Sequence, residues 1–140
     1  MRVYLACAMT NPHREVGAVE SILQMLVEQG HHVLTPHVVD TPERSQDRFL
    51  TNAEVARRDL LFIAQADCLV AEVSTPSHGV GIEVMAAVSA AKPVLALAHV
   101  QARVSRLLSG LPGLRLERYV TREEAVETVR RFLASVAGKP

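Results

Sequence analysis

Short, largely apolar runs recur along this chain, and segments with helical spacing of apolar residues separate them. The runs cover residues 2–8, 32–35, 68–73 and 93–98, and a weaker, alternating one covers residues 114–119. A run that is apolar on both faces is typical of a parallel strand covered by helices on either side. Strands that alternate with helices build such a sheet. We therefore predict an α/β fold with about five parallel strands and helices on both faces, the last strand lying at an edge.

The segments between these runs carry helix start and stop signals. Thr51 or Asn52 can cap a helix that continues to about residue 65. Thr121 and Glu124 form a capping box that opens the last helix, because the threonine accepts from the backbone and the glutamate reaches back. A short helix is expected over residues 103–108.

The predicted strand order determines where a ligand would bind. For one domain of this length the natural order is flavodoxin-like, 2-1-3-4-5, with the crevice between the carboxyl ends of the first and third strands. Those ends are residues 8–10 and 74–81. The second segment holds small residues, a proline and two glycines, so a ligand can approach its backbone closely. Residues 38–50 are polar and aperiodic, as in a lid, a binding loop or a disordered segment.

The composition argues against several classes of protein. The 140 residues hold 15 basic and 15 acidic side chains, a balance unlike that of a nucleic-acid tract or a polybasic membrane patch. No apolar run approaches the roughly 20 residues of a membrane-spanning helix. The six histidines share no ligand-like spacing with a cysteine or carboxylate, so we expect neither a metal nor a cofactor. We expect residues 1–140 to form one cytoplasmic domain.

Two carboxylates lie on the segments that flank the third predicted strand. Glu83 follows the glycine-containing turn directly, on an otherwise apolar helix, and is either a solvated first-turn residue or a reactive group. Asp59 lies on the preceding helix, and is either paired with Arg57 or Arg58 on a solvated face or placed opposite Glu83. Paired carboxylates in a partly apolar site suit glycosidic bond cleavage, in which one attacks the sugar and the other assists the leaving group.

Other residues near the predicted crevice also have two interpretations. Tyr4 lies in the middle of the first strand, where it is a core residue whose hydroxyl needs a partner, such as a carboxylate at the end of the neighbouring strand. Ser77, with Gly79 and Gly81, forms either an anion-binding turn at a helix N-terminus or an ordinary turn. Cys7 is a candidate thiolate nucleophile, but it lacks a local histidine base and suits the core better.

Taken together, these residues resemble the 2′-deoxynucleoside 5′-monophosphate N-hydrolases, within the nucleoside 2-deoxyribosyltransferase superfamily. The similarity is strongest over residues 59–83, D-L-L-F-I-A-Q-A-D-C-L-V-A-E-V-S-T-P-S-H-G-V-G-I-E. It extends to V-Y-L near the start, to V-L-T-P-H-V and to K-P-V-L-A-L, and so covers most of residues 2–110. Its most specific part is the run A-E-V-x-x-P-S-x-G-V-G-x-E.

The resemblance implies a role for each matching residue. Glu83 matches the nucleophile that forms a glycosyl-enzyme ester, Asp59 the carboxyl group that assists departure of the base, and Tyr4 the tyrosine that orients the nucleophile. Ser77 matches a serine that binds the 5′-phosphate, where the related transferases carry an acidic residue that meets a free 5′-hydroxyl. His37 is similar to a residue that lines the base pocket.

The resemblance also implies a homodimer, and it weakens at one loop. Ser105 is similar to a serine donated across the dimer interface to the same phosphate. Met9 and Thr10 lie in the first loop, which the family uses to supply backbone amides and an arginine to the phosphate. The family's usual loop reads G-S-I-R-G-G, whereas this chain reads C-A-M-T-N-P, so His13 or Arg14 would have to replace the missing arginine.

The sequence therefore predicts a homodimeric hydrolase that releases the free base from a 2′-deoxynucleoside 5′-monophosphate. A transferase that exchanges bases on deoxynucleosides is the first alternative. A nucleotide-binding module whose carboxylates are structural is the second.

Overall fold

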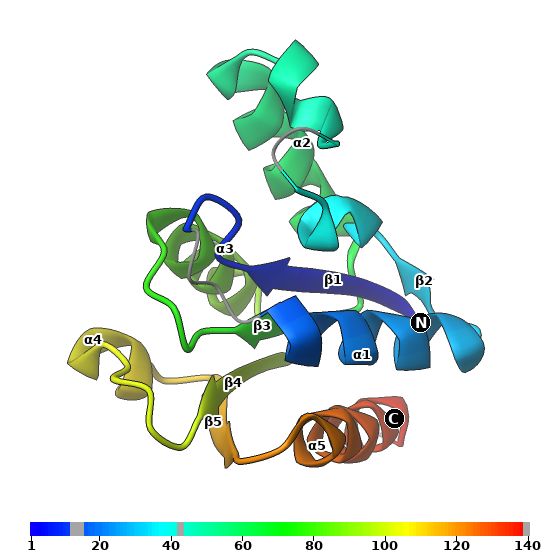
Figure 1. Ribbon diagram of the computed structural model, residues 1–140, viewed down its shortest axis with the longest axis vertical. Coiled ribbons are helices and arrows are strands. Elements are labelled where there is room, and N and C mark those ends of the chain that lie inside the picture. The colour runs from blue at the N-terminus through cyan, green and yellow to red at the C-terminus, as the bar shows by residue number, and fades with distance from the viewer. Residues whose placement is uncertain (12–15, 42–43, 139–140) are drawn as a thin grey trace.

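A computed structural model gives the structure of the chain, and it describes residues 1–11, 16–41 and 44–138. Five strands form one sheet in the order β2-β1-β3-β4-β5, and every neighbouring pair is parallel (Figure 1). The strands are β1 (Arg2–Cys7), β2 (His32–Val33), β3 (Cys68–Glu72), β4 (Val94–His99) and β5 (Leu114–Tyr119). The predicted α/β fold, strand order and edge position of the last strand are confirmed.

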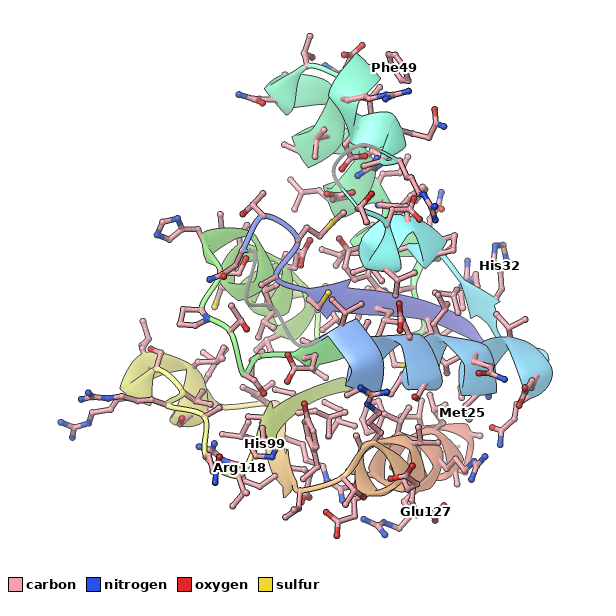
Figure 2. The ribbon with its side chains drawn as sticks, in the orientation of Figure 1. Met25, His32, Phe49, His99, Arg118 and Glu127 are labelled. Atoms are coloured by element: carbon pink, nitrogen blue, oxygen red, sulfur yellow. The ribbon has the colours of Figure 1, made fainter. Side chains whose placement is uncertain are left out.

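Helices cover both faces of this sheet. They are α1 (Val16–Glu28), α2 (Asn52–Gln65), α3 (His78–Ser89), α4 (Arg106–Ser109) and α5 (Arg122–Ala137), with 3-10 turns η1 (Pro36–Val39) and η2 (Gln46–Phe49) between β2 and α2. Helices α1 and α5 lie side by side on one face, and α2 packs against α3 on the other (Figure 1). The end of α2 that meets η2 projects beyond the sheet, and Phe49 lies at this tip (Figure 2). No helix of the described residues is long and apolar enough to cross a membrane.

The alternation of side chains along β1 divides the core into two halves. Leu5 and Cys7 face α1 and α5, whereas Tyr4 and Ala6 face α2 and α3. Cys68 of β3 joins Cys7 on the α1 side, and both are buried free thiols, as expected of core residues. The direction of Tyr4 matters most for function, because it sends the phenol toward the side of the sheet that carries both candidate carboxylates.

Strand β2 is shorter than the predicted run over residues 32–35. Its ladder stops at Val33, although the backbone amide of Leu34 still donates to Val3 at 2.9 Å. Beyond that point the buried Thr35 side chain replaces the ladder, since its Oγ1 accepts from the amide of Leu5 at 3.0 Å and donates to the carbonyl of the same residue at 2.6 Å. A side chain thus continues the pairing of β2 with β1.

The loop expected over residues 38–50 contains the end of η1 and the whole of η2, with Ser45 accepting from the amide of Asp47 at 3.2 Å, and its residues 42 and 43 lie outside the described part of the chain. One predicted boundary needs correction. The short helix expected over residues 103–108 begins later, at Arg106, because Ser105 acts as its N-cap and accepts from Leu108.

Capping boxes start two of the helices. Thr51, rather than Asn52, caps α2: its amide donates to Glu54 at 2.7 Å and its hydroxyl accepts from the Glu54 amide at 3.3 Å. Thr121 and Glu124 form the predicted box at the start of α5. The first of these boxes fixes the start of the helix that carries Asp59.

Candidate active site

A hydrogen bond between Tyr4 and Glu83 lies at the centre of the candidate site. The Tyr4 hydroxyl donates to Oε1 of Glu83 at 2.7 Å. Tyr4 comes from the middle of β1 and is 2% exposed, and Glu83 lies in the second turn of α3 and is half-buried. The residue pattern alone predicts a carboxylate at the end of the neighbouring strand, whereas the family resemblance predicts Glu83, and the observed partner is Glu83 on α3.

Burial controls the charge state of this pair. It raises the pKa of Glu83 to about 7, with a smaller rise from the negative charge of Asp59 and an opposing effect from the Tyr4 hydrogen bond. Burial and the neighbouring Glu83 carboxylate raise the pKa of Tyr4 well above its usual range. Tyr4 therefore remains a neutral donor, and Glu83 titrates close to neutral pH, where many catalytic carboxyl groups titrate.

Asp59 combines both interpretations that the sequence leaves open. The Arg58 guanidinium contacts Oδ1 of Asp59 through Nε at 2.9 Å and through Nη2 at 2.8 Å, so the expected ion pair exists. Asp59 is nevertheless no remote surface charge, because its electrostatic effect reaches both Tyr4 and Glu83. The structure thus brings Tyr4, Glu83 and Asp59 together on the α2 and α3 side of the sheet.

A second carboxylate, which no sequence pattern indicates, also contacts Arg58. Nη1 of Arg58 contacts Oδ1 of Asp47, and Nη2 lies 3.3 Å from its Oδ2, which lowers the pKa of Asp47. Asp47 belongs to η2, so one arginine links this turn to the helix that carries Asp59. His37 of η1 lies within electrostatic reach, since burial and then Arg58 lower its pKa while Asp47 and Asp59 oppose that shift. The charges of Asp47 and Asp59 therefore act on His37, whose place in a base pocket stays a prediction.

Ser77 and the two glycines form the start of α3. The Ser77 hydroxyl is the N-cap and accepts from the amide of Val80 at 3.4 Å. Among the described residues, a Cβ built on Gly81 would have nothing within 4 Å, and one on Gly79 would meet only the Ser77 hydroxyl at 3.8 Å. Packing against these residues therefore does not require glycine at either position. This openness suits the predicted approach of a ligand to the backbone.

A large groove begins at this same turn. Its volume is about 930 Å³, and it lies between the first turns of α3 and residues 103–111. Ser77 and Ser105 both line it, together with exposed apolar side chains that include Ile82, Met85 and Leu107. Neither carboxylate of the site lines the groove, so the start of α3 separates the groove from the Tyr4 and Glu83 pair.

The first loop is described only in part. Met9 is half-buried and packs against the core on the α1 side, and Thr10 is exposed just beyond the end of β1. Thr10 is thus available to a ligand, and most of Met9 is not. His13 and Arg14, the candidates to replace the missing arginine, lie outside the described residues. In the described part of the chain, no three histidine, cysteine, aspartate or glutamate side chains gather as a metal site would require.

A parallel α/β sheet with a carboxylate on each of α2 and α3 and a tyrosine on the strand face below them is an arrangement suited to glycosidic bond chemistry. A model of the family described as nucleoside 2-deoxyribosyltransferase matches residues 3–128, and the chain therefore belongs to this family. The resemblance seen in the sequence is thereby confirmed.

Individual relatives agree with this assignment. A Thermofilum pendens protein with the provisional name 2′-deoxynucleoside 5′-phosphate N-hydrolase 1 is 39% identical over 137 residues, or 95% of each chain. The 5-hydroxymethyl-dUMP N-hydrolase of Mus musculus is 35% identical over 130 residues, covering 88% of this chain and 74% of the mouse protein. Among solved structures, the CMP N-glycosidase of Clostridium botulinum has the same fold, with a TM-score of 0.71 and 21% identity, over 94% of this chain and 99% of the other.

Proposed function

We propose that this protein hydrolyses the N-glycosidic bond of 2′-deoxynucleoside 5′-monophosphates, releasing the free base and deoxyribose 5-phosphate. Membership of the family and the names of the relatives support cleavage of N-glycosidic bonds in nucleotides. The observation that carries the proposal is the 2.7 Å hydrogen bond from Tyr4 to Glu83. It orients a carboxylate that titrates close to neutral pH, at the position expected of the nucleophile.

In the proposed mechanism, the ionised Glu83 carboxylate attacks C1′ of the sugar while the bond to the base breaks. Tyr4 holds the oxygen that does not attack, and this fixes the direction of the other. Asp59 assists departure of the base by giving it a proton, and the Asp59 carboxylate, held in place by Arg58, regains a proton from the attacking water in the second step. Water then hydrolyses the glycosyl ester, so the configuration at C1′ is retained overall.

The remaining predicted residues have roles in binding. Ser77 and the first amides of α3 donate hydrogen bonds to the 5′-phosphate, helped by the positive end of the helix dipole. Gly79 and Gly81 leave room for it, Thr10 and the backbone of Met9 approach it from the end of β1, and His37 lines the base pocket. A carboxylate at position 77 would repel a phosphate, and the serine here supports a nucleotide substrate over a nucleoside.

The groove beside α3 supports a homodimer. Ile82 is 63% exposed, Met85 48% and Leu107 82%, a set of large apolar side chains more typical of an interface than of a monomer surface. A second copy of the chain seated there would bring its own Ser105 toward the neighbouring site. Ser77 and Ser105 line the groove within one chain, so the serine that reaches a given phosphate could come from either copy.

The direct test is incubation of the pure protein with each deoxynucleoside 5′-monophosphate, the matching ribonucleotide and the matching deoxynucleoside, with detection of the free base. We expect release from deoxynucleotides and its loss in Glu83→Gln. Glu20→Gln, an exposed change on α1, is the matched control and should leave the rate unchanged. Activity of Glu83→Gln near the wild-type rate would exclude the mechanism.

Base exchange is a second candidate, because the family model that matches the chain is described as a transferase. It requires a glycosyl ester that survives until a second base arrives. Adding an acceptor base and looking for a new nucleoside or nucleotide separates exchange from hydrolysis. Binding with neither product would instead indicate a non-catalytic nucleotide-binding module.

A further inference from the structure

Glu72, the last residue of β3, is a buried carboxylate that the mechanism above does not use. It is 2% exposed and is the only acidic or basic side chain among the buried residues that the structure describes. Its strand neighbours in register are Cys7 of β1 and Leu97 of β4, so it lies inside the sheet near the carboxyl edge. A carboxylate at such a position is costly unless it is hydrogen-bonded, and is seldom kept for packing alone.

Within the part of the chain that the structure describes, Ser74 and Tyr119 donate hydrogen bonds to this carboxylate. The backbone amide of Ser74 lies 3.2 Å and 3.3 Å from its two oxygens, and the Ser74 hydroxyl donates to Oε1. The hydroxyl of Tyr119, the last residue of β5, donates to the same Oε1 at 3.0 Å. Glu72 therefore connects the end of its own strand to the end of an edge strand two positions away in the sheet.

Ser74 extends the connection to β4. Its hydroxyl accepts from the backbone amide of His99, the last residue of that strand, at 2.7 Å. The rings of His99 and Tyr119 meet edge to face with centroids 5.7 Å apart, and His99 is labelled at this edge in Figure 2. Hydrogen bonds thus hold together the carboxyl ends of β3, β4 and β5, and Glu72 accepts most of them.

Ser74, which makes hydrogen bonds to both Glu72 and His99, begins the turn that leads to the proposed phosphate site. Only Thr75 and Pro76 separate it from Ser77, and proline limits the freedom of this short segment. The position of the Ser77 hydroxyl and of the first amides of α3 therefore depends on where Ser74 is fixed. The Glu83 carboxylate lies six residues beyond that cap and is held separately by Tyr4.

We propose that Glu72 is a positioning residue for phosphate recognition, which acts by holding Ser74 so that the turn before α3 presents Ser77 and its amides to the 5′-phosphate. This inference rests on the proposed function, since it assigns the turn to that phosphate. It separates two tasks within the site: Glu72 and Ser74 fix the phosphate end, and Tyr4 fixes the nucleophile.

The test compares Glu72→Gln, Ser74→Ala and Tyr119→Phe with wild type and with Glu117→Gln, a change on the partly exposed side of β5 that removes only the contact with Arg115. Each folded variant is assayed for KM and kcat on the best deoxynucleotide. Calorimetry gives the Kd of deoxyribose 5-phosphate and of the matching deoxynucleoside. A residue that only stabilises the fold would weaken both ligands alike, whereas one that positions the phosphate turn would weaken only the phosphorylated ligand.

We expect Glu72→Gln and Ser74→Ala to raise KM and the Kd of deoxyribose 5-phosphate by about tenfold, the effect of losing about one hydrogen bond. Tyr119→Phe should raise both by about threefold, and kcat and the nucleoside Kd should change less than about twofold. Equal weakening of both ligands, or an unchanged Kd for deoxyribose 5-phosphate in a folded variant, would overturn the inference. Should Glu72→Gln fail to fold, Tyr119→Phe decides by the same criteria.

Failure of the proposed function gives a different result from failure of this inference. If the wild-type protein turns over no nucleotide, the proposed reaction is wrong, and the two Kd values alone decide the role of Glu72. If the wild-type protein does not bind deoxyribose 5-phosphate, there is no phosphate site to position and the inference is overturned.

Discussion

Tyr4 and Glu83 are 79 positions apart in the chain, and the phenol of one donates to the carboxylate of the other at 2.7 Å. The strand that carries Tyr4 turns every second side chain toward α2 and α3, and this brings the hydroxyl to the second turn of α3. The same contact lowers the pKa of Glu83 against the larger rise that burial causes. Several of the expected results depend on this balance.

Tyr4→Phe should shift the acid limb of the pH profile. The hydrogen bond from Tyr4 favours the ionised form of Glu83, so its loss raises the pKa of Glu83 above its present value of about 7. Because the nucleophile must be ionised, the acid limb of kcat/KM should move to higher pH, and the rate at pH 7 should fall about tenfold or more. An acid limb that stays in place would show that Tyr4 does not act through Glu83.

Glu83→Gln should stabilise the protein at high pH while it abolishes activity. Since the pKa of Glu83 is raised from 4.5 to about 7, the folded state binds the proton more tightly than the unfolded state between these pH values. The stability of the wild-type protein therefore falls as pH rises through this window. By urea unfolding, the variant should exceed the wild type at pH 8 by roughly 1–3 kcal/mol, and the gain should vanish near pH 4. The same difference at both pH values would contradict burial of an ionisable Glu83.

Gly81→Ala should separate stability from binding. The position is helical and a Cβ meets none of the described residues within 4 Å, so alanine should raise the free energy of unfolding by about 0.5–1 kcal/mol. The added methyl group would fill space that the substrate or the partner copy needs, so KM should rise. Gly138→Ala, at the end of α5, is the matched control and should leave KM unchanged. If Gly81→Ala keeps the wild-type KM, Gly81 does not border the space that the ligand or the partner copy occupies.

Leu107→Glu should disrupt the proposed dimer. Leu107 is 82% exposed on α4 and lines the apolar groove, where a carboxylate would lose its hydration on association. Sedimentation velocity should give a dimer for the wild type and a monomer for this variant. Val27→Glu, a comparable change at a 60% exposed position on α1, should remain dimeric. A monomeric wild-type protein, or a dimeric Leu107→Glu variant, would rule out this interface.

The fold is largely predictable from the sequence because it depends on patterns that are local. Apolar runs, helical spacing and capping boxes each occupy a few residues, and the order of five parallel strands follows from their alternation with helices. The predicted end of β2 is wrong for a reason that no pattern shows. The Thr35 side chain replaces backbone pairing there, and a threonine suits a strand equally well.

It is harder to predict which side chains of the candidate site contact one another than which residues lie near it. Alternation along β1 indicates the face of Tyr4 but not the element above it, so the pattern alone gives the wrong source for its carboxylate partner, whereas the resemblance predicts the contact with Glu83. From its sequence neighbours Asp59 is either a surface ion pair or a site residue; the structure shows the ion pair with Arg58 and an electrostatic effect of Asp59 on Glu83, and the catalytic role stays a prediction. Whether such charged side chains approach one another depends on the directions in which they point, and the spacing of residues in the sequence does not give those directions.

Two further carboxylates escape prediction for different reasons. Asp47 lies in an aperiodic segment, where no pattern indicates that η2 would carry it to Arg58. Glu72 does carry a signal, namely that it is one acidic residue at the end of a strand that is otherwise fully apolar and buried. Because a buried carboxylate requires donors, that single exception to the apolar pattern is itself an indication of a hydrogen-bonded group.

The stereochemistry of the first product tests the role of Glu83 most directly. Turnover of a deoxynucleoside 5′-monophosphate in water containing methanol, followed by proton NMR, reports the configuration of the methyl glycoside formed. A glycosyl ester on Glu83 predicts the β anomer, the configuration of the substrate, because the two displacements each invert C1′. Exclusive formation of the α anomer would mean a single displacement by solvent, and would contradict a covalent role for Glu83.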